Sequence, residues 1–161
     1  MPIILGAIAV EAAMTALYMK WRRLNEDLLE SEVTQAHRDQ WEDDYCDGTK
    51  KRGFVRSANF ISNYLTGVAF FDDFVTSFFD SGSKSEVIAA GLPTSLKLAR
   101  ANYIQGELFD RRNRIMHWGQ VNHSKDEAAS AVAAARTAFA VLLLMDKTRA
   151  EEHEKELRAH A

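Results

Sequence analysis

Apolar side chains recur every three or four positions along the start of the chain. They are Ile3, Ala7, Val10, Met14, Leu17, Trp21, Leu24 and Leu28. This spacing places them on one face of a helix, so we predict a helix from Pro2 to about Glu30 that packs against other helices. A membrane anchor is the alternative. We do not favour it, because Glu11 interrupts the apolar run and the periodic face continues past Lys20 into charged sequence.

The middle of the chain combines a polar stretch with an aromatic one. Residues 31–45 are acidic and polar, and we expect a second helix or an extension of the first there, followed by a loop at 47–53. Residues 54–79 form one predicted helix whose helically spaced positions are Phe60, Tyr64, Gly67, Phe71, Phe74 and Phe78. Such an aromatic pattern is typical of a core helix. A short helical piece follows and ends at Gly91.

The next predicted helix contains the most unusual residues of the chain. Thr94 or Ser95 is expected to cap it, and it runs through His117. Gly119 lies just beyond, where a left-handed residue commonly ends a helix.

A last helix is predicted from a capping-box pattern, Ser124 followed by Glu127. Its expected apolar face consists of Ala128, Val132, Ala135, Phe139, Leu142 and Met145. The polar tail from about residue 150 is expected to fray. The sequence shows no strand pattern and no repeat, so we predict one all-α domain over residues 1–161, an antiparallel bundle of four to five helices.

Composition limits the classes of function. The formal net charge of −3 gives no overall attraction to nucleic acid or to an anionic membrane. Cys46 is the only cysteine, so no disulfide forms within the chain, and a reducing, cytoplasmic location is expected. His117 and His123 match no helical metal-ligand spacing, and the sequence has no glycine-rich phosphate loop. We therefore expect neither a metal nor a cofactor.

The segment Arg111–Gly119, RRNRIMHWG, concentrates charge at the end of the predicted helix that runs through His117. Two of its arginines have simple partners, because Glu107 precedes Arg111 by four residues and Asp110 precedes Arg114 by four. Each spacing predicts a surface ion pair worth a few tenths of a kcal/mol, about 0.2–0.5. These two arginines therefore need no functional explanation.

Arg112 has no such partner. It lies beside the apolar face, four residues after Leu108, and burying an unpaired guanidinium costs several kcal/mol. It must therefore meet an anion, pair inside the core or face a second subunit. Asn113 lies four residues after Phe109, and His117 follows Asn113 by four residues on the same helix face.

The run from Arg112 to Gly119 resembles the Arg-polar-x(3)-His motif of HEPN domains. HEPN domains are α-helical bundles, and many are metal-independent endoribonucleases. The motif ends their penultimate long helix, as it does here. The resemblance rests on about residues 95–145. One feature departs from it: some family toxins carry a tyrosine two residues after the histidine, where a partner enzyme modifies it, and this chain has Gly119.

The resemblance implies a homodimer in which two motifs face each other across a cleft. It assigns proton transfer to His117 and stabilisation of the phosphate charge to Arg112, and Asn113 orients one of them or the substrate. Attack by the RNA 2′-OH then leaves a 2′,3′-cyclic phosphate. Imidazole and guanidinium suit these two tasks. Such a protein would be a toxin or a defence effector, with an antitoxin or other regulator as partner.

Two further residues are candidate RNA contacts. Arg114 adds to a local charge of +3 between Ser95 and His117, which contains five basic residues and two acidic ones. Trp118 either stacks on a base or packs against the last helix.

Two alternative functions stay open at this point. One is a non-catalytic HEPN-like module that binds a nucleotide, an RNA or a protein. The other is a structural bundle in which Arg112 forms a core or intersubunit ion pair.

Overall fold

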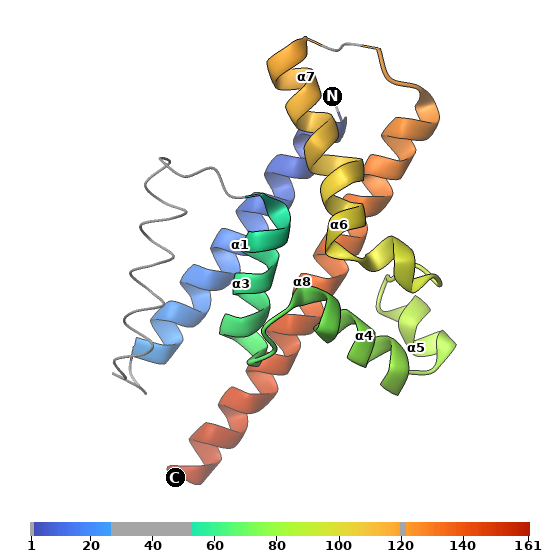
Figure 1. Ribbon diagram of the computed structural model, residues 1–161. Helices are drawn as coiled ribbons and strands as arrows, with labels where there is room; N and C mark the ends of the chain where they lie inside the picture. Colours follow the sequence, from blue (N-terminus) through green and yellow to red (C-terminus); the bar gives the residue numbers. More distant parts are fainter. Residues whose placement is uncertain (1, 27–52, 120–121) are drawn as a thin grey trace.

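The part of the chain that the structure describes consists of helices and the turns between them. The computed structural model describes residues 2–26, 53–119 and 122–161. Its elements are α1 (Pro2–Glu26), α3 (Phe54–Thr66), α4 (Phe71–Ser81), α5 (Lys84–Ala89), η2 (Leu96–Ala99), α6 (Ala101–Ile104), η3 (Gln105–Asp110), α7 (Arg111–Trp118) and α8 (Lys125–Ala159). No strand occurs in these ranges, which confirms the all-α class (Figure 1). The polar stretch at 31–45 lies outside the described residues.

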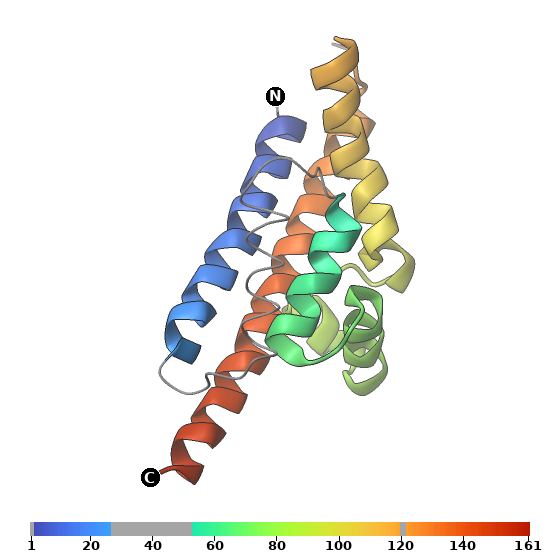
Figure 2. The same ribbon diagram turned by 60° about the vertical axis from the view of Figure 1, so that its left-hand side comes forward.

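The helices are not all antiparallel. Elements α6, η3 and α7 follow one another directly and form one rod, Ala101 to Trp118. Figures 1 and 2 show α1, α3 and α8 running in about the same direction and the rod running against them. The antiparallel prediction is therefore correct for the rod and wrong for α1, α3 and α8. Residues 27–52 separate α1 from α3, which is enough chain to return to the starting end.

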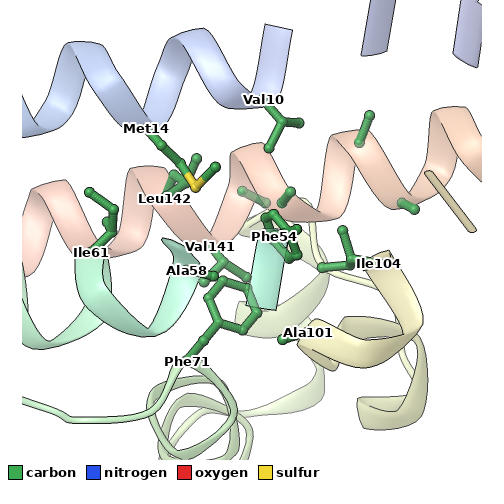
Figure 3. Packing of buried hydrophobic residues seen from close by; sticks show 14 of the residues in the cluster. Val10, Met14, Phe54, Ala58, Ile61, Phe71, Ala101, Ile104, Val141 and Leu142 are labelled. Atoms are coloured by element: carbon green, nitrogen blue, oxygen red, sulfur yellow. The ribbon is translucent and has the colours of Figure 1, made fainter. Parts of the chain in front are cut away.

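The core lies where α1, α3, the rod and α8 meet. The buried face of α1 consists of Ile3, Ala7, Val10, Met14, Tyr18 and Trp21. The predicted face of α1 is thus confirmed for the described residues, except that Tyr18 replaces Leu17 and that Leu24 is exposed. Leu28 and the predicted helix end near Glu30 lie outside the described residues. Figure 3 shows Val10 and Met14 of α1 beside the side chains of α8 and α3.

The buried face of α8 differs in part from the predicted one. Of the predicted positions, Ala135, Leu142 and Met145 are buried. The remaining buried residues of the helix are Ala131, Ala134, Thr137, Ala138, Ala140, Val141 and Arg149. Because α8 contacts α1, α3 and the rod, more than one side of it is covered, and a single apolar face could not describe it.

The single helix predicted over residues 54–79 is wrong, because the chain breaks at Gly67. Gly67 has a φ of 76°, a left-handed conformation that favours glycine, and it ends α3. Side chains then stabilise the turn. The Ser62 hydroxyl donates to the Val68 carbonyl, and the Phe71 N–H that starts α4 donates to Asn59 Oδ1.

The start of the rod also differs from prediction. Neither Thr94 nor Ser95 caps it, since the helix begins at Ala101 after the separate turn η2. Its first N–H, on Ala101, donates to Asp72 Oδ1 of α4 at 2.8 Å. A carboxylate from another helix therefore replaces the local cap, and it binds α4 to the rod.

Helix α8 begins as predicted and ends later than predicted. Its Ser124 hydroxyl accepts a hydrogen bond from the Glu127 N–H at 3.1 Å. The tail from about residue 150, for which fraying is expected, is helical as far as Ala159. Arg149 pairs with Glu156 at 3.1 Å, one of the contacts that hold this extension in helical form.

Among the described residues, two helices have the length and composition of membrane-spanning segments. They are α1, over Pro2–Leu24, and α8. The most apolar window of α1 is 28% buried inside the protein, and that of α8 is 50% buried. Core helices of soluble proteins meet the same criterion, so this finding does not assign a location.

Candidate functional site

A π-helical turn sets the orientation of the motif helix. Between α6 and α7, residues Gln105–Asp110 form η3, in which hydrogen bonds join residues five apart. The side chains follow this spacing, because Gln105 Nε2 donates to Asp110 Oδ1 at 2.8 Å. Asp110 therefore lies toward Gln105 and does not pair with Arg114, so that predicted ion pair is wrong. Gly119, with a φ of 62°, ends α7 as predicted.

Arg112 forms an ion pair with Glu11 of α1. The distance from Arg112 Nη1 to Glu11 Oε1 is 2.6 Å, with 22% and 40% of the two side chains exposed. The guanidinium also lies 5.2 Å from the centre of the Phe109 ring, which covers one of its sides. Of the three kinds of partner expected for Arg112, the structure thus shows a partly buried pair within one chain.

Asn113 holds the other edge of the same guanidinium. Its Oδ1 accepts from Arg112 Nε at 3.4 Å and from Nη2 at 3.3 Å. Both contacts are long, so this edge is held more weakly than the edge facing Glu11. Arg112 and Asn113 are therefore brought together, with one edge of the guanidinium available for exchange.

His117 is the last residue but one of α7 and is exposed. Within the described residues its imidazole makes no hydrogen bond or ion pair. The structure therefore places the motif residues on one short helix without closing them into a single contact network.

Trp118 is 82% exposed, so the expectation that it packs against the last helix is wrong. Met116, 64% exposed, is also on this helix end. An indole in this position leaves a flat apolar face open to a ligand or to another protein surface.

Arg111 and Arg114 have different surroundings. Arg111 pairs with Glu107, as predicted, and its Nη1 donates to the Glu127 carbonyl at 2.6 Å, which ties α7 to α8. Arg114 is exposed and makes no ion pair within the described residues. Of these two cations, Arg114 is the one available for a ligand.

A polar hollow opens between α7 and the start of α8. Its volume is 120 Å³, and the residues that line it are Ile3, Arg111, Arg114, Ile115, Asn122, His123 and Glu127. Helical spacing does not group Asn122 and His123 with Arg114, because it says nothing about residues in a loop. The one sequence feature that points to them is their position between the end of one helix and the cap of the next.

The local charge is lower than the sequence suggested. The predicted excess of +3 already includes Glu107, which pairs with Arg111, and the pairing of Arg112 with Glu11 of α1 lowers it to +2. In the described ranges no group of three or more His, Cys, Asp or Glu residues is arranged to hold a metal ion. The site offers a tethered guanidinium, an exposed imidazole and one free arginine.

Comparisons with protein-family models, curated proteins and solved structures found no match.

Proposed function

We propose that this protein is a metal-independent endoribonuclease of the HEPN type. The observation that carries the proposal is the arrangement on α7. Arg112 is held by Glu11 and Asn113, while His117 lies further along the same helix, open to solvent. A fixed guanidinium and a free imidazole are the two groups that RNA cleavage by its own 2′-OH requires.

In this proposal His117 and Arg112 have different chemical roles. His117 accepts the proton of the 2′-OH as that oxygen bonds to the phosphorus, and the protonated imidazole then donates a proton to the 5′-oxygen as the bond between phosphorus and that oxygen breaks. The weakly held Nε–Nη2 edge of Arg112 binds the phosphate and stabilises its growing negative charge, while Glu11 keeps the opposite edge fixed. Asn113 positions Arg112 and gives up its long contacts when the phosphate arrives.

The proposal includes a homodimer with the site at its interface. One chain leaves apolar side chains exposed on α7 and on the adjacent N-terminal part of α1: Leu5, Ile8, Met116 and Trp118. Since α1 and α7 contact each other, we propose that a second copy of the chain covers these exposed residues. A second copy would bring a second His117 toward the first motif. We also propose a cytoplasmic toxin or defence effector controlled by a regulatory partner.

One observation favours a second candidate, a non-catalytic binding module. Arg112 already has a carboxylate partner, and a phosphate would have to compete with Glu11 for the guanidinium. In such a module Trp118 and Arg114 would bind RNA through stacking and charge, without turnover.

The test is cleavage of single-stranded and structured RNA by the purified protein in EDTA. We expect cleavage products that end in a 2′,3′-cyclic phosphate, and we expect DNA to stay intact. Arg112→Ala and His117→Ala should each abolish cleavage, whereas Arg136→Ala, which removes an exposed arginine from α8, should not. RNA that stays intact but binds with strong salt dependence would favour the binding module instead.

A further inference from the structure

The hollow beside α7 is too small for a whole nucleotide and large enough for one ring. Its 120 Å³ corresponds to about four water molecules at roughly 30 Å³ each. Pockets for drug-sized ligands begin near about 300 Å³. The hollow is therefore suited to a single planar group that projects from a longer ligand.

The charges around the hollow do not favour a phosphate. Arg111 is already engaged by Glu107 and by the Glu127 carbonyl. This leaves the cation of Arg114 in the same lining as the Glu127 carboxylate, and the first turn of α8 adds Lys125 and Asp126. The two positive and two negative charges cancel, so a neutral polar group is favoured over a phosphate.

The lining offers the mixture of groups that a nucleobase needs. Arg114 supplies hydrogen-bond donors, Glu127 supplies acceptors, and Asn122 supplies both. Ile3 and Ile115 contribute apolar surface, which suits the face of an aromatic ring.

The hollow is close to the proposed cleavage site along the helix. Arg114 precedes His117 by three residues, and side chains three apart on a helix are neighbours at about 5–6 Å between their Cβ atoms. A base bound against Arg114 would therefore belong to a nucleotide next to the phosphate that His117 reaches.

We propose that this hollow is a base-binding subsite that receives one nucleobase of the RNA and gives the protein a base preference. This proposal rests on the proposed function, because it takes RNA as the ligand. In this proposal Arg114, Asn122 and Glu127 form hydrogen bonds with the edge of the base, and His123 is a further lining residue, from the loop before α8.

The test measures binding without cleavage. Fluorescently labelled 2′-O-methyl hexanucleotides of U, C, A and G lack a free 2′-OH, so fluorescence anisotropy reports affinity whether or not the protein is a nuclease. An abasic hexamer of the same charge reports the phosphate contribution alone. We expect one base to bind at least about fivefold more tightly than the weakest, because a paired base edge carries that much discrimination.

Variants then locate the preference. Asn122→Ala and Arg114→Ala should bring the affinity ratio between the four oligonucleotides close to one, and Glu127→Gln should change which base is preferred. Arg136→Ala removes an exposed arginine of α8 that does not line the hollow, and it should keep the ratio.

The base-binding proposal is overturned if the four oligonucleotides and the abasic chain bind equally, if none of them binds, or if the ratio survives both Asn122→Ala and Arg114→Ala. Equal binding with a steep salt dependence would identify the hollow as a phosphate contact. Base preference without any RNA cleavage would support the subsite and refute the proposed ribonuclease activity, so the two proposals fail separately.

Discussion

The ion pair between Glu11 and Arg112 joins the first helix to the motif helix, and Glu11→Gln removes its charge while keeping the size of the side chain. At the observed 2.6 Å, two unit charges attract by roughly 1.6 kcal/mol in water and more where solvent is partly excluded. Desolvation and the fixing of two long side chains offset much of this attraction. We therefore expect a coupling free energy of about 1 kcal/mol, near the upper end for exposed pairs.

A double-mutant cycle measures this coupling directly. Glu11→Gln, Arg112→Gln and the double variant are unfolded in urea, and the free energies of unfolding are compared with that of the wild type. The exposed pair Lys155–Glu152, at 2.9 Å within one helix, is the matched control and should show a smaller coupling of about 0.2–0.5 kcal/mol. A coupling for Glu11–Arg112 no larger than that of the control would refute the reasoning.

The same variant also has a functional readout. If Glu11 competes with phosphate for the guanidinium, then Glu11→Gln should bind uncleavable RNA more tightly at low salt, and the gain should shrink as salt is added. If Glu11 instead positions Arg112 for catalysis, the cleavage rate at saturating RNA should fall while binding tightens. If Glu11→Gln changes neither the RNA affinity nor the cleavage rate, Glu11 has no part in RNA binding or catalysis.

Three further predictions concern the fold that carries the site. Asp72→Ala removes the acceptor of the first N–H of the rod and should lower the free energy of unfolding by about 1 kcal/mol. An unchanged urea midpoint would show that Asp72 does not stabilise the start of the rod. Gly119→Ala should cost roughly 1–2 kcal/mol because its φ is 62°, while Gly106→Ala, which has open space around it and an ordinary φ, should not destabilise; equal losses at both sites would contradict this. Met14→Ala, at a residue 1% exposed, should cost about 2–5 kcal/mol in chemical denaturation, and Leu5→Ala, at a residue 63% exposed, should cost far less.

Local sequence rules predicted the features that depend on neighbouring residues. The buried face of α1 follows from its periodicity, the end of α7 follows from Gly119, and the start of α8 follows from Ser124. Each of these needs only the spacing of side chains along one helix, or the conformation that one residue type prefers.

The same rules could not predict contacts between helices. Glu11 and Arg112 are 101 positions apart, and no helical spacing links them. The π-helical turn before Arg111 moves Asp110 away from Arg114. Amino-acid composition does not predict a turn of this kind. The break at Gly67 was missed for a related reason, because its turn is completed by Asn59 and Ser62 in the preceding helix.

The central claim is tested most directly by the ends of RNA produced in EDTA by the wild-type protein and by His117→Ala. The account predicts that the wild type leaves 2′,3′-cyclic phosphate ends and that His117→Ala, folded to the same stability, leaves the RNA intact. Equal cleavage by the two proteins, or wild-type products without the cyclic phosphate, would contradict it.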